Sequence, residues 1–268
     1  MQHYESISSA QNPRIRTLLQ LQQKSSERRQ RGLFVVEGER ELRRCLRAGF
    51  EADTLFFCPD IVPPETLSYI ETFVNVKVFA VSRSVYEKIA YRGSTEGVMA
   101  EVRIRKVSLE ELYLEDNPLV MVLESVEKPG NLGAVLRSAD AAGADAVIVC
   151  DPMTDLFNPN LIRSSLGAVF TVPCVACSSA ECIHYLQSRH IRILTAQLQD
   201  SELYYDTDMT TGLALVMGTE STGLTQQWRA VADAHIRIPM SGQMDSLNVS
   251  VSAAVLLYEA VRQRHSSK

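Results

Sequence analysis

The sequence predicts an α/β protein of two domains. Its 268 residues suffice for two domains of ordinary size, and 46% hydrophobic with 22% charged residues is typical of a soluble globular protein. Short runs rich in β-branched residues alternate with longer amphipathic stretches, which is the pattern of repeated strands and helices. No run of about 18 apolar residues occurs, and the amino terminus lacks the apolar core of a signal peptide. We therefore expect a cytoplasmic protein that contacts no membrane.

The first half of the chain predicts a compact α/β unit. Runs such as LFVVEG and VKVFAV indicate strands, and the stretches between them indicate helices. We expect strands at residues 33–38, 54–58, 76–81 and 97–104, and helices at 39–48, 64–73 and 82–90.

The second half predicts a parallel sheet with helices on both faces. Its strands are apolar throughout rather than alternating, as expected when both faces of a sheet are covered. We expect strands at residues 118–124, 146–150, 171–175, 192–196, 213–218 and 235–239, and helices at 131–142, 158–166, 179–188, 224–231 and 246–264. The domain boundary should lie in the charged stretch 105–117.

Ligands of open parallel sheets bind beyond the carboxyl ends of the strands, and the segment PGNLGAVLR follows one such strand. Asn131 is suited to cap the next helix. Arg137 lies at the edge of the apolar stripe of that helix and needs an anionic partner, for which guanidinium suits phosphate or carboxylate. A salt bridge with Asp140 or another acid is the structural alternative.

A second such segment, GTESTGLT, follows the strand at 213–218. Gly218 and Gly223 permit close backbone approaches, while Glu220 between them would repel phosphate. No P-loop or GxGxxG is present. The loop therefore favours a ligand with amines, hydroxyls or positive charge; a tight turn with a capping Thr or Ser is the alternative.

The third segment, IPMSGQMDSLNVSVSAA, places Ser246 and Asn248 at the head of an unusually apolar helix. Such a helix should be buried, and buried polar side chains need partners. We expect one pocket that unites Asn131, Arg137, Glu220, Ser246 and Asn248.

Net charge is −5, but residues 14–31 carry six basic side chains against Glu27 alone. A basic patch on an acidic body is typical of a protein that touches phosphate with one end, although a solvated helix face is an equal alternative. The six residues are Arg14, Arg16, Lys24, Arg28, Arg29 and Arg31.

Cys174 and Cys177 form a lone CxxC without a second pair, so we expect buried thiols and no metal.

The three segments, in this order, resemble the three motifs of the SpoU family, RNA 2′-O-ribose methyltransferases of the SPOUT superfamily. The resemblance spans roughly residues 118–264. It implies S-adenosylmethionine as methyl donor, a carboxyl-terminal trefoil knot, and a homodimer formed through the carboxyl-terminal domain. Lys128 departs from the many relatives that carry an acid there.

The resemblance also implies roles for individual residues. Arg137 would act on the ribose hydroxyl, assisted by RNA phosphate, and the remaining catalytic residues would position it or the loops. The catalytic set is Asn131, Arg137, Glu220, Ser246 and Asn248; the cofactor-binding set is Met217, Gly218, Glu220, Gly223, Ile238, Met240 and Leu247.

The first half resembles the L30e-like substrate-binding domain often attached to this family, through SAQNPRIRTLLQL, RRQRGLFVVEGERELRRCL and GSTEGVMAEV. We therefore expect an L30e-like RNA-binding domain at 1–108, a linker at 109–117 and a SPOUT methyltransferase domain at 118–268. Ribosomal RNA is the favoured substrate. The alternatives are transfer RNA and a non-catalytic RNA-binding or ribosome-assembly role; a hydrolase has little support because no GxSxG elbow occurs.

Overall fold

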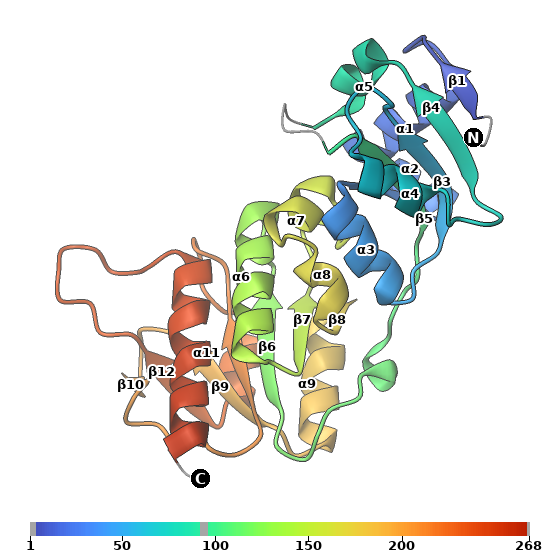
Figure 1. Ribbon diagram of the computed structural model, residues 1–268. Coiled ribbons are helices and arrows are strands. Elements are labelled where there is room, and N and C mark those ends of the chain that lie inside the picture. The colour runs from blue at the N-terminus through green and yellow to red at the C-terminus, as the bar shows by residue number, and fades with distance from the viewer. Residues whose placement is uncertain (1–3, 92–95, 267–268) are drawn as a thin grey trace. The chain divides into compact units, whose positions relative to one another are not determined.

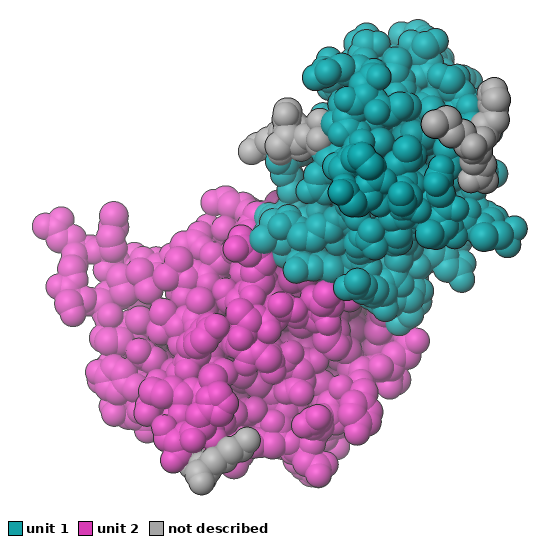
Figure 2. All heavy atoms as spheres, viewed as in Figure 1, with its two compact units in different colours: residues 1–105, 157–167 teal, residues 106–156, 168–268 magenta. Residues whose placement is uncertain are grey.

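The computed structural model describes residues 4–91 and 96–266. Part of the GSTEGVMAEV stretch, residues 93–95, lies outside them. The chain divides into two compact units: unit 1 comprises Met1–Arg105 with Phe157–Gly167, and unit 2 comprises Lys106–Leu156 with Ala168–Lys268 (Figure 2). Residues 157–167, which the sequence assigns to the second half, thus group with unit 1. The predicted domain boundaries remain predictions.

Unit 1 is built on a mixed sheet of five strands in the order β1-β4-β3-β5-β2. Strands β1, β4 and β3 are parallel, whereas β5 runs antiparallel to both β3 and β2. The strands are β1 (Glu5–Ile7), β2 (Leu33–Glu37), β3 (Ala52–Phe57), β4 (Lys77–Val81) and β5 (Val98–Arg103). The helices are α1 (Pro13–Gln23), α2 (Ser25–Arg31), α3 (Glu39–Arg47), α4 (Pro64–Ile70), α5 (Arg83–Ile89) and α7 (Pro159–Ser164).

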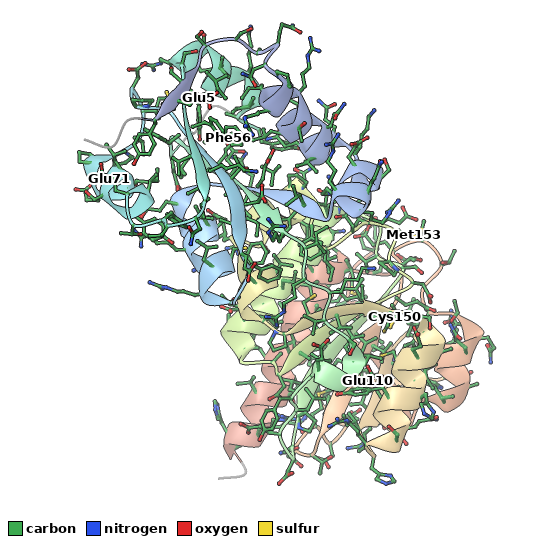
Figure 3. The ribbon with its side chains drawn as sticks, turned by 90° about the vertical axis from the view of Figure 1, so that its right-hand side faces the viewer. Glu5, Phe56, Glu71, Glu110, Cys150 and Met153 are labelled. Carbon is green, nitrogen blue, oxygen red and sulfur yellow. The ribbon has the colours of Figure 1, made fainter. Side chains whose placement is uncertain are left out.

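Local sequence explains where the unit 1 helices begin and end. Asn12 caps α1 by accepting a hydrogen bond from the Arg14 amide at 2.9 Å, and Pro13 occupies the first turn. Gly32 ends α2 in the left-handed conformation. Leu18 of α1 and Tyr86 of α5 pack with Phe56 of β3 in the core of the unit (Figure 3).

Unit 2 is built on seven strands in the order β10-β12-β9-β11-β6-β7-β8, and all neighbouring strands are parallel. The prediction of a parallel sheet is confirmed. The strands are β6 (Leu119–Glu124), β7 (Ala146–Cys150), β8 (Cys174–Cys177), β9 (Arg192–Ala196), β10 (Glu202–Leu203), β11 (Leu213–Met217) and β12 (Ala234–Arg237). The helical elements are η1 (Leu109–Glu111), α6 (Pro129–Ala142), α8 (Ala168–Thr171), α9 (Ser179–Ser188), α10 (Gln226–Val231) and α11 (Val249–Ser266).

Helices cover both faces of this sheet. On one face α6 and α11 lie side by side (Figure 1). On the other face, Leu186 of α9 and Trp228 of α10 pack with Val120, Val122 and Ile148 in one buried cluster. The buried central strands therefore need the continuous apolar sequence that predicted them.

Some predicted elements are wrong in position, and six were not predicted: β1, α1, α2, η1, α8 and β10. Helix α6 begins at Pro129 rather than at 131, so Asn131 lies within its first turn and is not its cap. The strand predicted at 171–175 is β8 at 174–177, because Thr171 is the last residue of helix α8. The last helix begins at Val249 rather than at 246. The two-residue strand β10 carries too little pattern to be predicted. No helix in the described ranges has the length and apolarity needed to cross a bilayer. The trefoil knot stays a prediction.

Candidate active site

The three sequence segments meet at the carboxyl edge of the unit 2 sheet. Strands β6 and β11 are neighbours, with Leu123 paired to Met217, so the loops that follow them leave the same edge. Helix α11 packs against α6 and brings its first residues to this edge. Topology thus brings together residues more than one hundred positions apart in sequence.

Glu220 is the hub of the cluster. Its Oε1 accepts hydrogen bonds from the side-chain amides of Asn131, at 2.7 Å, and Asn248, at 3.0 Å. The Asn248 amide also donates to Asn131 Oδ1 at 3.3 Å. One residue from each segment therefore takes part in a single hydrogen-bond network.

Lys128 belongs to the same network. Its ammonium group lies 3.2 Å from Glu220 Oε2, with the lysine side chain 70% exposed. An exposed pair of this kind contributes little to stability. Its effect is local, because the ammonium group of Lys128 offsets the charge of the Glu220 carboxylate.

Asn248 also explains the polar head of the last helix. Its Oδ1 accepts from the Ser250 amide at 3.0 Å, and its backbone carbonyl accepts from the Ser252 amide at 3.0 Å. Asn248 is thus the cap of α11. With Oδ1 committed to the helix, its amide group is oriented toward Glu220.

The turn of the second segment is closed by its two glycines. A Cβ atom on Gly218 would lie 2.3 Å from the Gly223 carbonyl group, and Gly223 has a φ of +66°. Only glycine fits the first position, and the second is in the region that favours it. Thr219 and Gly223 form an isolated bridge across this turn, so Glu220 is presented from a tight loop.

Glu124 is a positioning residue that sequence reasoning missed. This carboxylate ends β6, is 2% exposed, and accepts from both the amide and the hydroxyl of Thr225, at 2.8 and 2.7 Å. It thereby ties the start of α10 to the strand that precedes the first segment. An acid at the end of an otherwise apolar strand was the available signal.

Arg137 and Ser246 do not join the network. Arg137 is exposed, and no hydrogen bond or ion pair links it to another described residue. It lies six residues beyond Asn131 on α6, about 9 Å along the helix axis. The alternative partner Asp140 instead accepts from Thr171. Ser246 is exposed and contacts its neighbour Asp245 at 3.4 Å.

The predicted cofactor residues lie in two places. Gly218 and Glu220 line a solvent-open pocket of about 160 Å³ together with Val126, Asn131 and Val249, while Met217 is buried at the end of β11. Ile238, Met240 and Leu247 lie in the long loop between β12 and α11, much of which is exposed (Figure 1). The pocket is also lined by Lys128, so it offers the Glu220–Lys128 ion pair, the Asn131 amide and apolar walls, which fit a ligand with polar and apolar parts.

The basic residues of unit 1 divide into two groups. Arg28 is 3% exposed and donates to the Leu21 carbonyl at 2.6 Å, so its guanidinium is not available to a ligand. The other five side chains of the predicted patch are exposed: Arg14, Arg16, Lys24, Arg29 and Arg31. Helix α3 adds four arginines that the sequence analysis missed. Arg40, Arg43, Arg44 and Arg47 line a surface hollow together with Glu39 and Glu96, and Arg40 and Arg43 form ion pairs with Glu41 and Glu39.

A doubly covered parallel sheet with a polar network at its carboxyl edge defines an α/β protein that binds a ligand through its strand-to-helix loops. Residues 118–258 match the model of the SpoU rRNA Methylase family, and residues 12–100 match that of the MRM3-like substrate binding domain. The chain belongs to the SpoU rRNA methylase family.

Known RNA methyltransferases are similar to this chain in sequence and in structure. The chain is 36% identical to the 23S rRNA (guanosine-2′-O-)-methyltransferase RlmB of Vibrio vulnificus, over 73% of this chain and 81% of the relative. A crystal structure of an RNA 2′-O ribose methyltransferase is 38% identical, with a TM-score of 0.85 and coverage of 97% and 99%. The SpoU methyltransferase AviRb of Streptomyces viridochromogenes in complex with AdoMet is 28% identical, with a TM-score of 0.89 and coverage of 96% and 99%.

Proposed function

We infer that this protein transfers a methyl group from S-adenosylmethionine to a ribose 2′-hydroxyl of 23S ribosomal RNA. The observation that carries the proposal is the network of Asn131, Glu220 and Asn248, because it joins all three family segments at one sheet edge. The AdoMet complex of AviRb, similar over nearly its whole length, supports the cofactor.

S-adenosylmethionine, when bound, supplies the electrophilic methyl carbon on its sulfonium. The protein must then hold a weakly acidic hydroxyl in line with that carbon and help to remove its proton. Glu220 and the loop from Gly218 to Gly223 are proposed to lie on the cofactor side of the pocket, because Glu220 is a hydrogen-bond acceptor that lines it and the tight turn allows the backbone a close approach to a ligand. Ile238, Met240 and Leu247 are proposed to close over the cofactor.

Arg137 is proposed to act on the substrate. Its exposed guanidinium has no ion pair with any residue that the structure describes and is therefore available for the phosphate beside the target ribose. Because neutral arginine is very costly in water, its minimum role is to clamp that phosphate and orient the hydroxyl. Ser246, in the exposed loop before α11, is proposed to add a hydrogen bond to the substrate or cofactor.

Unit 1 is proposed to hold the RNA. It matches a substrate-binding domain, and the exposed side chains of Arg14, Arg16, Lys24, Arg29 and Arg31 supply positive charge for phosphates. Arg28 is removed from this set because it is buried. The arginines of α3 are added to it.

The homodimer is proposed to form through unit 2. Helix α11 leaves Val251 and Tyr258 48% and 50% exposed, seven residues apart on one stripe, and Met244 and Leu247 add apolar surface in the preceding loop. An apolar stripe of this kind favours a protein partner. The trefoil knot and a cytoplasmic location belong to the same proposal.

The experiment is a methyl-transfer assay on RNA from a strain that lacks this gene. Purified 23S RNA and transfer RNA are incubated separately with the protein and tritiated S-adenosylmethionine, and the labelled nucleotide is then mapped. We expect label at one ribose of 23S RNA. Label confined to transfer RNA would favour that substrate instead, and failure to bind the cofactor would favour the non-catalytic role.

A further inference from the structure

Three cysteines from separate segments converge on the side of the unit 2 sheet covered by α9. Cys150 ends β7, Cys177 ends β8, and the two are paired in register across these neighbouring strands. Cys182 lies in the first turns of α9. All three sulfur atoms lie within 4.8 Å of one another, and no other group of three potential ligands from His, Cys, Asp and Glu occurs in the described ranges.

The strand geometry explains why the CxxC spacing concealed this cluster. Side chains on a strand alternate between faces, so Cys174 and Cys177, three residues apart at the two ends of β8, point to opposite faces. Cys177 packs with the core cluster that contains Cys150 and Cys182, whereas Cys174 is not a member of that cluster. The third thiol comes from the helix rather than from the CxxC pair.

The surroundings suit a bound cation. Cys150 and Cys182 are 0% exposed, which removes competing water, while half-buried Cys177 leaves a route to solvent. The amino end of the ten-residue helix α9, capped by Ser178, favours negative charge on nearby sulfurs. Each thiol is held by a regular element, so the three are preorganised. In Figure 3 Cys150 lies within the body of unit 2.

We propose that Cys150, Cys177 and Cys182 form a binding site for a thiophilic divalent cation of the zinc class. Thiolates are the preferred protein ligands of such ions, and metal–sulfur bonds of about 2.3 Å place sulfurs roughly 3.8 Å apart. The required adjustment is a small rotation of side chains. Binding displaces the thiol protons to solvent, and a water molecule reached past Cys177 completes the fourth position. The site lies outside the network of Asn131, Glu220 and Asn248.

The test uses the full-length, fully reduced protein and Cd²⁺ alone as the probe. Cd²⁺ bound by thiolates absorbs in the near ultraviolet, so a titration gives both stoichiometry and affinity. We expect one Cd²⁺ per chain, displaced by Zn²⁺, together with a rise in the unfolding temperature. Cys177→Ser should weaken binding at least about tenfold, on the scale of a lost metal-site contact.

Cys174→Ser is the matched control, because it removes a half-buried thiol from the same strand that lies outside the triad. It should bind Cd²⁺ as the wild type does. Cys182→Ser provides a second test, and circular dichroism establishes that each variant is folded. Absence of the absorption band, unchanged binding by both triad variants, or equal loss in Cys174→Ser would each overturn the proposal. None of these readouts depends on methyl transfer.

Discussion

At the scale of single residues, the site is organised by the hydrogen-bonding capacity of a few side chains. Glu220 accepts hydrogen bonds from the side-chain amides of Asn131 and Asn248 and forms an ion pair with Lys128. These contacts connect the second segment to the first and the third. Asn248 uses its oxygen for the helix and its nitrogen for the network. Arg137, in contrast, has no such intramolecular partner among the described residues and is free for substrate.

Arg137→Ala should abolish methyl transfer while changing cofactor affinity only modestly. The expected loss in kcat is about 10²- to 10⁴-fold, the range for a positioned group that assists proton transfer. Steady-state transfer and equilibrium binding of S-adenosylmethionine measure the two effects separately. Arg189→Ala, which removes an arginine beside Tyr185 on α9, is the control and should methylate as the wild type does. Retained turnover in Arg137→Ala would contradict the assigned role.

Glu101 of β5 should make stability depend on pH. Burial, with repulsion from Asp53, raises its pKa to about 7, and its Oε1 has no hydrogen-bond partner among the described residues. Because the native state binds this proton more tightly than the unfolded state does, the stabilising contribution is complete below pH 4.5 and is lost as pH rises through 7.

Glu101→Gln should therefore flatten that dependence. We expect the wild-type free energy of unfolding to fall by about 1–3 kcal/mol between pH 5 and pH 8 through this group. The free energy of unfolding of the variant should change much less over the same range. Urea unfolding at the two pH values measures the difference. A variant with the same slope as the wild type would show that Glu101 is not the group responsible.

At the scale of elements, α11 begins at a residue with two roles, because Asn248 both caps the helix and donates a hydrogen bond to Glu220. The sequence analysis identified a polar head on an apolar helix and predicted that Asn248 shares a pocket with residues of the other two segments; in the structure Asn248 donates to Glu220 and Asn131. The predicted helix began three residues too early, at Ser246 instead of Val249, because Ser246 and Leu247 are as compatible with a helix as with a loop. The boundary follows from the hydrogen bonds of Asn248, which no local pattern encodes.

Asn248→Ala and Asn248→Asp should separate the two functions of this residue. Alanine removes the cap and should cost about 1 kcal/mol of unfolding free energy. Aspartate keeps an acceptor for the Ser250 amide but places a second carboxylate against Glu220, so it should preserve the cap and lose methyl transfer. Urea unfolding and transfer rates are the measurements; full activity of the aspartate variant would contradict the network.

Other elements show the same division between local and tertiary information. The strands of the parallel sheet were predictable because burial on both faces demands apolar runs. The grouping of residues 157–167 with unit 1 was not, since it depends on contacts such as Phe157 with Phe34 at a ring separation of 4.5 Å. The cysteine triad was hidden likewise, because strand register and a helix bring its members together.

At the scale of the whole molecule, oligomeric state should depend on the exposed stripe of α11. Tyr258→Glu places a charge on that stripe and should weaken self-association at least about 100-fold, comparable with loss of an interface hot spot. Sedimentation equilibrium measures the change, with exposed Gln227→Glu on α10 as the control. A monomeric wild type, or a dimer unaffected by Tyr258→Glu, would contradict a dimer formed through α11.

The central claim is that the methyl group goes to a ribose oxygen, and alkaline hydrolysis of the labelled 23S RNA tests it most directly. A 2′-O-methyl group blocks the attack by which alkali cleaves the neighbouring phosphodiester. We predict that the tritium will remain in an alkali-resistant dinucleotide. Recovery of the tritium in mononucleotides would place the methyl group on a base and contradict the assignment.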